Sequence, residues 1–280
     1  MSATPLLGAE PPPRSRVLRG LARPGQLPLV DTAGEYAVFV LRAFAGFRFL
    51  PKFAAEVLRQ IGLLVAGSAL VIIFICFIVG TACGIAAESI GQAIGASITG
   101  PIFSSYCVNR EIVPFLFGFI LAAKVGGGIV AQLGAMRVNQ EVDAMEIIGI
   151  PSMTFMVSTR MVASMIVLPI LYLISIGAAE GASWIGSYVR SHTISQGTWE
   201  FVYYTVTNVN DILYSLIKGL VISTAVVTVA LYFGYRVRGG PVEVGTATAR
   251  SMAVNLILVT VLNLTMTFLF WGFNPRLPIA

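Results

Sequence analysis

The chain has 280 residues, of which 56% are hydrophobic and only 11% are charged, and its mean hydropathy is +0.85. Soluble domains carry about 25% charged residues, so this composition excludes a soluble domain and indicates an integral membrane protein. The net charge of +5 gives no support to a nucleic-acid partner. The first 35 residues are rich in proline and arginine and predict a flexible cytoplasmic tail.

Five apolar runs follow the tail, and each can cross a hydrocarbon core that takes about 20 helical residues. They are residues 61–87, 112–136, 157–184, 212–235 and 251–273. Lipid tolerates no unpaired backbone group, so such segments must be helices. The sequence therefore predicts an all-α integral membrane protein with five transmembrane helices in a single domain over residues 36–275.

Lysine and arginine are distributed unevenly between the two sides that five spans define. With the N-terminus inside, the inner segments 1–60, 135–160 and 234–250 contain 13 of the 18 basic residues. Cytoplasmic loops of membrane proteins carry such an excess. We therefore predict a multi-pass protein with its N-terminus in the cytoplasm and its C-terminus outside.

Residues 36–59, ahead of the first span, are amphipathic when they are placed on a helical wheel. Arg42, Arg48 and Lys52 share one face, and aromatic side chains occupy the other. Pro51 is expected to break this segment into two helices. A basic face opposite an aromatic face is typical of a helix in the membrane interface. We favour this over a sixth, hairpin-like span, because the charges are costly in hydrocarbon.

A short acidic helix is predicted over residues 139–149, between the second and third spans. Asn139 is a suitable N-cap, and Glu141 lies in the first turn, where the helix dipole favours an anion. Gly149 suits the left-handed position after the last turn, and Pro151 prevents continuation. The segment thus carries both a start signal and a stop signal.

The predicted acidic helix has two faces. Asp143 and Glu146 share the polar face, while Ala144, Met145 and Ile148 share the apolar one. One face can dock in an apolar socket while the other reaches a basic partner. From these residues alone, a solvated helix that only joins two spans is an equal alternative.

Several polar side chains lie within the apolar runs. Lys124 is too deep in the second span for its stem to reach the interface easily, so it should face a polar cavity, a partner or a lipid headgroup. The alternative is a lysine that snorkels with local thinning of the bilayer. Lys218 and Asp211 lie two turns apart in the fourth span, and snorkelling is an equal alternative for them. Gln132 and Asn263 belong to a class that more often bridges helices than binds substrate.

Small residues recur at the four-residue spacing of helix contacts, where they let backbones approach closely. The glycine run in the second span suggests close contact or bending there. The candidates for helix packing are Gly80, Gly84, Gly126, Gly127 and Gly128. This pattern is common in membrane proteins and does not specify a function.

Missing motifs exclude most enzyme classes. No lysine follows a glycine, so the chain has no Gly-Lys-Ser/Thr phosphate loop of its own. His192 is the only histidine, which excludes a histidine-rich metal site, and no serine–histidine placement suggests a hydrolase. We therefore predict a transport subunit with no catalytic residue, metal or cofactor.

Two stretches of the chain resemble the MlaE/YrbE family of lipid-transporter permeases. The first runs from Glu111 to Arg160 and includes Ala-Lys-Val-Gly at 123–126, Ala-Gln-Leu-Gly-Ala-Met-Arg at 131–137 and the acidic helix. The second runs from Asp211 through Lys218 to Arg250. Their order and spacing hold across roughly residues 36–273. The tail is most like that of the actinobacterial YrbE subunits of Mce lipid-transport complexes.

The resemblance implies a permease subunit of a multi-subunit ABC transporter, located in the inner (cytoplasmic) membrane and moving phospholipid, fatty acid or a related lipid across the envelope. It implies an interfacial elbow helix, five transmembrane helices and a coupling helix that docks on a cytoplasmic ABC ATPase dimer. ATP and Mg would bind to that partner. The implied coupling residues are Arg137, Glu141, Asp143, Glu146 and Gly149. The candidate residues of a lipid pathway are Lys124, Gln132, Lys218 and Asn263.

The same resemblance implies a second permease chain, a lipid pocket between the two permeases, and lipid-carrying MCE-domain proteins outside. The family often has Glu where this chain has Gln132, and Asp where it has Asn263. These two amides argue against a role for a membrane carboxylate in this subunit. We hypothesise that a paired, non-identical permease, a YrbE paralogue, supplies those charges.

Two alternatives from other functional classes stay open. An ion-driven secondary transporter would have inverted repeats around polar groups at the membrane midplane, and no internal repeat is evident. A structural membrane anchor of an envelope complex would need no transport pathway. The sequence does not indicate which lipid is moved, or in which direction.

Overall fold

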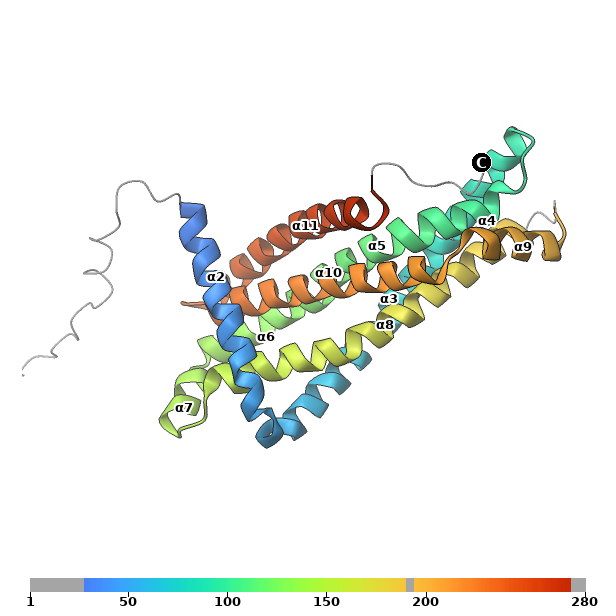
Figure 1. The fold of residues 1–280 in the computed structure, drawn as a ribbon. Coiled ribbons are helices and arrows are strands. Elements are labelled where there is room, and N and C mark those ends of the chain that lie inside the picture. The colour runs from blue at the N-terminus through green and yellow to red at the C-terminus, as the bar shows by residue number, and fades with distance from the viewer. Residues whose placement is uncertain (1–27, 190–193, 273–280) are drawn as a thin grey trace, which may run out of the picture. The chain divides into compact units, whose positions relative to one another are not determined.

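The computed structural model describes residues 28–189 and 194–272, which are helical apart from short connections. Five helical stretches in this part of the chain are long and apolar enough to cross a membrane (Figure 1). They run over Ala33–Ala93, Thr99–Val138, Thr154–Val189, Val209–Tyr235 and Pro241–Trp271. The predicted all-α architecture with five spans is therefore confirmed. Most of the predicted tail lies outside the described residues.

The first long stretch contains three helical segments. Helix α2 (Pro28–Ala45) begins inside the predicted tail and leads into the 3₁₀ helix η2 (Gly46–Phe53) and then α3 (Ala54–Ala93). Pro51 lies within η2, which separates α2 from α3, so the segment is divided into two α-helices near the proline as predicted. The described residues divide into two compact units at Arg42. The interfacial position of residues 36–59 stays a prediction.

The second stretch alternates between α- and π-helical geometry. It consists of α4 (Thr99–Phe103), η3 (Ser104–Ile112), α5 (Val113–Ile120), η4 (Leu121–Gly126) and α6 (Gly127–Val138). Both η3 and η4 are π-helical. Such wide turns are rare and occur often at functional sites. Arg110 and Glu111 lie on η3 and Lys124 on η4, so three of the four charged residues of this stretch coincide with its irregular geometry.

Two short helices lie at opposite ends of the second unit (Figure 1). Helix α7 (Glu141–Ile147) follows α6, and α9 (Gln196–Val206) precedes α10 (Val209–Tyr235). Asn208 and Asp211 form a reciprocal capping box that starts α10, which satisfies two backbone donors at that end. The position of α9 shows that the loop between the third and fourth spans is partly helical.

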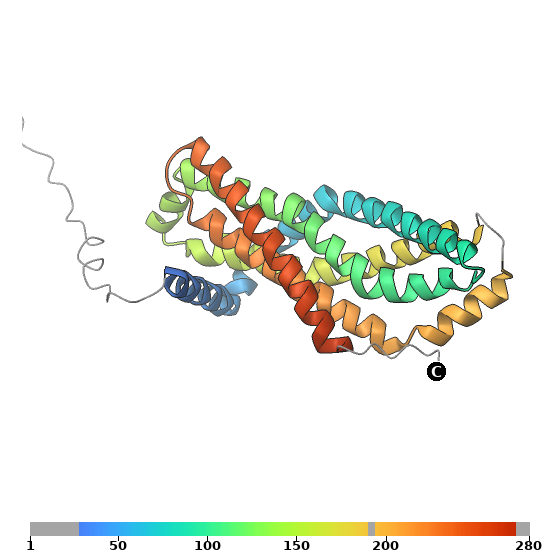
Figure 2. The same ribbon diagram turned by 90° about the horizontal axis from the view of Figure 1, so that it is seen from above.

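The remaining elements complete the third and fifth spans. The π-helical η5 (Thr154–Ser158) opens the third span, α8 (Thr159–Trp184) forms its body, and the π-helical η6 (Ile185–Val189) closes it. Helix α11 (Pro241–Trp271) is the fifth span and packs on α10, α5 and α6 (Figure 2). The buried Asn255 on α11 donates to the Val226 carbonyl on α10 at 3.3 Å, so an amide bridges two spans.

Helices α3 and α8 approach each other through glycine. A Cβ atom at Gly80 would lie 2.2 Å from the Ala179 carbonyl oxygen, and one at Gly84 would lie 2.3 Å from the Ser183 carbonyl oxygen. The predicted packing role of these two glycines is confirmed. Gly128 differs, because a Cβ atom there would meet nothing within 4 Å. The prediction that it packs against another helix is therefore wrong.

We predict that Gly80→Ala destabilises the chain, because its methyl group would overlap the Ala179 backbone. Overpacking of this kind costs about 1–3 kcal/mol. Thermal unfolding in detergent measures the effect, and Gly62→Ala is the matched control on α3, since a Cβ atom at Gly62 would meet open space. Equal unfolding temperatures for the two variants would contradict the close α3–α8 contact.

Candidate functional site

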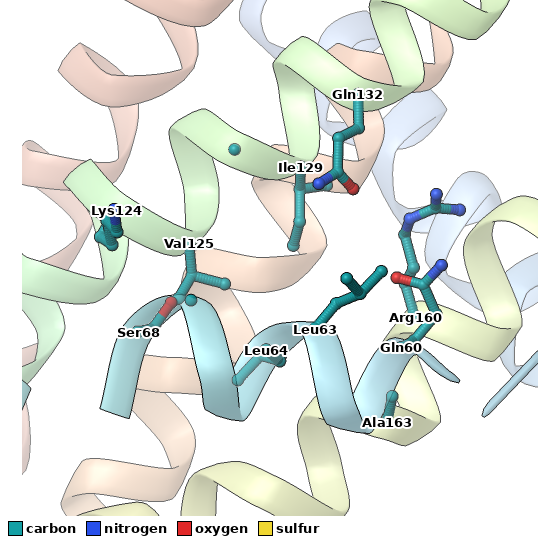
Figure 3. A pocket seen from close by; sticks show the side chains of 12 residues that line it. Gln60, Leu63, Leu64, Ser68, Lys124, Val125, Ile129, Gln132, Arg160 and Ala163 are labelled. Atoms are coloured by element: carbon teal, nitrogen blue, oxygen red, sulfur yellow. The ribbon is translucent and has the colours of Figure 1, made fainter. Parts of the chain in front are cut away.

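A cavity of about 230 Å³ lies between three of the spans (Figure 3). Its walls come from α3, from η4 and α6, and from α8. The lining residues are Gln60, Leu63, Leu64, Gly67, Ser68, Lys124, Val125, Gly128, Ile129, Gln132, Arg160 and Ala163. Leu63, Lys124 and Gln132 are exposed, so the cavity opens on the surface of the chain. The predicted pathway residues Lys124 and Gln132 thus both line one cavity.

The polar groups gather at the two ends of this cavity. Lys124 lies at one end, and Arg160, Gln60 and Gln132 lie at the other (Figure 3). Leu63 and Ile129 lie between them. Gly67 and Gly128 also line the cavity, and a Cβ atom at either would meet nothing within 4 Å. Because these two glycines have no side chain, the cavity is wider between its two polar ends.

Arg160 is held in place but incompletely paired. The residue is 8% exposed, and its Nη1 donates to the Met156 carbonyl at 2.8 Å. Its Nη2 contacts Met136 Sδ at 3.9 Å, while its Nε has no acceptor among the described residues. Glu56, an acid on the neighbouring α3, accepts hydrogen bonds from Gln60 and Arg59 and not from Arg160. The guanidinium therefore keeps donor capacity for an anion.

The charged side chains that line the cavity are both cations. Lys124 and Arg160 line it, and no carboxylate does. Within residues 28–189 and 194–272, neither cation lies within ion-pair distance of an acidic side chain. A charge in a transmembrane segment is costly and marks a functional site by default. This cavity therefore favours an anionic ligand with an apolar part.

The second candidate site is α7 with the helix ends that surround it. Asn139 does not cap α7 as predicted. It is the C-terminal cap of α6, and Gln140 precedes α7 in a left-handed conformation with φ of 59°. Gly149 has φ of +80°, and the amides of Ile150 and Gly149 donate to the carbonyls of Met145 and Glu146. This is a Schellman motif, so the predicted stop signal is confirmed.

Helix α7 is tied to the spans by a chain of polar contacts. Arg137 on α6 pairs with Asp143 at 3.9 Å and donates to the Tyr235 carbonyl at 3.0 Å, with its guanidinium 4.4 Å from the Tyr235 ring centre. Ser152 donates to Glu146 at 2.6 Å and lies 3.2 Å from the Tyr235 hydroxyl. The partners of Asp143 and Glu146 thus belong to this chain. Both partners, Arg137 and Ser152, contact Tyr235 at the end of α10.

The exposed surface of α7 differs from the predicted apolar face. Val142 is the buried side chain that anchors the helix. Ile147 and Ile148 are 85% and 70% exposed, and Glu141 is also exposed. The wheel placed Ile148 on a docking face without Val142, because it took no account of the turn at Gln140. Two adjacent exposed isoleucines on a short helix provide an apolar tip for a partner.

A third polar cluster lies inside the bundle and was only partly predicted. Lys218 is completely buried, and its Nζ donates to the Arg110 carbonyl at 2.9 Å, Glu111 Oε2 at 3.0 Å and Thr267 Oγ1 at 2.7 Å. Asn263 donates to the same Glu111 oxygen at 3.0 Å. Lys218 therefore does not snorkel. Glu111 is a carboxylate within the second helical stretch and pairs with Lys218, so a carboxylate contributes to the packing of this bundle even though Gln132 and Asn263 are amides.

Asp211 belongs to a neighbouring ion pair. Its carboxylate accepts from Arg110 Nη2 at 2.9 Å and from Trp271 Nε1 at 2.8 Å. The Arg110 guanidinium also lies 4.0 Å from the Tyr106 ring centre. Sequence reasoning placed Arg110 and Glu111 just before the second span. Their helical geometry, which continues back to Thr99, brings both into the bundle.

We predict that Glu111→Gln and Lys218→Met each destabilise the chain, because each leaves a charge with fewer partners. The loss of a hydrogen bond to a charged group costs about 1.5–3 kcal/mol. The double variant should lose less than the sum of the two single losses. Thermal unfolding of all three variants in detergent measures this coupling, with Thr265→Val, an exposed site on α11, as control. Strictly additive losses would contradict the pairing.

Comparisons with known proteins identify the family of this chain. The family model for Permease MlaE matches residues 57–269. A probable ABC transporter permease protein of Rickettsia bellii is 25% identical over 247 residues, which cover 87% of this chain and 93% of that protein. The intermembrane phospholipid transport system permease protein MlaE of Haemophilus influenzae is 22% identical over 256 residues, covering 85% and 92%. The chain belongs to the MlaE permease family.

Proposed function

We propose that this chain is the membrane subunit of an ABC transporter that moves lipids across the inner membrane and cell envelope. The observation that carries the proposal is the cavity between α3, α6 and α8, which combines cations with apolar walls and opens on the surface of the spans. A phospholipid has the matching chemistry, an anionic phosphate joined to hydrocarbon. The relative from Haemophilus influenzae is named as a phospholipid transport permease, which supports the same substrate class.

ATP hydrolysis is assigned to a separate cytoplasmic ABC ATPase, which would bind ATP and Mg. Helix α7 is the proposed docking element, because it exposes Ile147 and Ile148 while Val142 anchors it to the bundle. Movement of α7 would reach the spans through the contacts of Asp143 with Arg137 and of Glu146 with Ser152. Both contacts lead to Tyr235 at the end of α10. This geometry supports α7 as a coupling helix.

The cavity supports a second permease as partner. Its exposed lining includes Lys124 and Gln132, which are costly to leave against lipid. A second permease chain packed over this face would enclose the pathway, and we retain a non-identical YrbE paralogue as the proposed partner. MCE-domain proteins of an actinobacterial Mce complex are the proposed outer partners. In this arrangement the N-terminus and α7 face the cytoplasm, and α9 faces outward.

We predict that Ile147→Asp and Ile148→Asp prevent the ATPase from co-purifying with the permease and abolish ATP-driven lipid transfer. An aspartate at the centre of an apolar contact would be buried without a partner, which costs several kcal/mol and corresponds to a loss of affinity of at least about tenfold. Pull-down of the ATPase and lipid transfer between proteoliposomes are the measurements.

The matched control is Phe201→Asp, because Phe201 is 72% exposed on α9, at the opposite end of the bundle. It should leave the ATPase bound. Normal ATPase recovery and lipid transfer with both isoleucine variants would refute the docking role of α7. Lipid transfer that continues without any ATPase would favour an ion-driven transporter instead.

A further inference from the structure

We propose that the cavity between α3, α6 and α8 binds the anionic, phosphate-bearing headgroup of a lipid, at two successive positions marked by Arg160 and Lys124. The inference rests on the proposed function in one respect, that the occupant is a lipid. It adds the charge class of that lipid and the residues that recognise it.

The two cations require an anion for electrostatic reasons. Arg160 is 8% exposed and its Nε has no acceptor among the described residues. A buried, incompletely paired guanidinium is costly. Lys124 lies 14 residues from Val138, the end of its span, or about 20 Å at 1.5 Å per residue. Its stem cannot span that distance to water, and a bound anion would compensate its charge.

The geometry of α6 places the two positions along one path. Lys124 on η4 and Gly128 and Gln132 on α6 are spaced four residues apart along one span, and all three line the cavity. Gln132 lies at the Arg160 end, and Lys124 lies at the other end (Figure 3). Gly128, between them, presents no side chain. A headgroup held by Arg160 and the amides of Gln60 and Gln132 can therefore move toward Lys124 through the space that Gly67 and Gly128 leave open, along the apolar wall of Leu63 and Ile129.

The walls and the volume distinguish a lipid headgroup from a free phosphate ion. Leu63, Leu64, Val125 and Ile129 line the same cavity, and such apolar side chains gain nothing from a bare ion. The volume of about 230 Å³ is below the range of about 300–1,000 Å³ typical of drug-sized ligands. It suits a headgroup with the first part of its acyl chains, while the remaining chain extends from the open side.

The test uses native mass spectrometry of the full-length chain with an equimolar mixture of dioleoyl phosphatidylglycerol and dioleoyl phosphatidylcholine. The two lipids share their acyl chains and differ in net charge. Wild-type protein should retain phosphatidylglycerol preferentially. Lys124→Gln should reduce that preference about tenfold, the effect of removing one charge-assisted hydrogen bond, and Lys124→Arg should preserve it. Arg160→Lys should also preserve it, and Arg160→Gln should reduce it.

Two further variants separate the cavity from general surface charge. Gly128→Leu should lower binding of both lipids, because the side chain would enter the open space of the cavity. Arg238→Gln should change nothing, because Arg238 is an exposed cation between α10 and α11 and does not line the cavity. An equal preference in wild type and Lys124→Gln would overturn the proposal, as would an effect of Arg238→Gln as large as that of Lys124→Gln.

Competition with inorganic phosphate distinguishes the two sources of the anion. Phosphate at 100-fold excess over the lipid should not displace phosphatidylglycerol, and complete displacement would overturn the lipid assignment. ATP-driven transfer is measured in parallel on the same variants. Lysine-dependent preference without ATP-driven transfer would contradict the proposed function and leave the headgroup site standing. ATP-driven transfer without any preference for the anionic lipid would contradict the headgroup site and leave the proposed function standing.

Discussion

The fold depends on a lysine ammonium that is completely enclosed by protein. Lys218 on α10 reaches the Arg110 carbonyl and Glu111 carboxylate on η3 and the Thr267 hydroxyl on α11. In hydrocarbon an ammonium has no water to replace a lost partner, so these three contacts hold three helices in a single relative register. Asn263 and Thr267 both donate to Glu111, which fixes the carboxylate from the α11 side.

Helix α10 carries that constraint toward the other end of the bundle. Lys218 lies in its first half, and Tyr235 is its last residue. There the Tyr235 backbone and ring contact Arg137, and its hydroxyl contacts Ser152. These two residues in turn hold Asp143 and Glu146 of α7. In the proposed coupling, a force applied to α7 would act on a helix whose far half is locked, and it would reach α6, which carries Arg137 and lines the cavity.

The sequence predicted the features that depend on composition and local chemistry. The five spans follow from the length of the apolar runs, the end of α7 follows from Gly149, and the α3–α8 contact follows from Gly80 and Gly84. Features that depend on long-range geometry were not predicted. Glu111 lies one residue outside the predicted second span, because the apolar run begins at Ile112 and nothing in the sequence marks a π-helix. Arg160 was not identified as a cavity residue, because its partners across the cavity lie on α3 and α6.

The same distinction applies to α7 and to Gly128. A helical wheel for residues 140–148 cannot show which face meets the bundle, because the left-handed turn at Gln140 sets that orientation. Gly128 has the spacing of a packing glycine, but it lies opposite open space. A small residue on a helix can face either a neighbouring helix or an open cavity. Which of the two it faces depends on how the helices pack, and the sequence of one helix does not show this.

The central claim is that lipid enters the cavity between α3, α6 and α8. Photo-cross-linking with a phospholipid that carries a diazirine on its acyl chain tests it most directly, with the modified residues located by mass spectrometry. The account predicts cross-links at Leu63, Leu64, Val125 and Ile129 that decrease in the Gly128→Leu variant. Cross-links confined to exposed positions elsewhere on the spans, such as Leu70 and Leu269, and unchanged by that variant would contradict it.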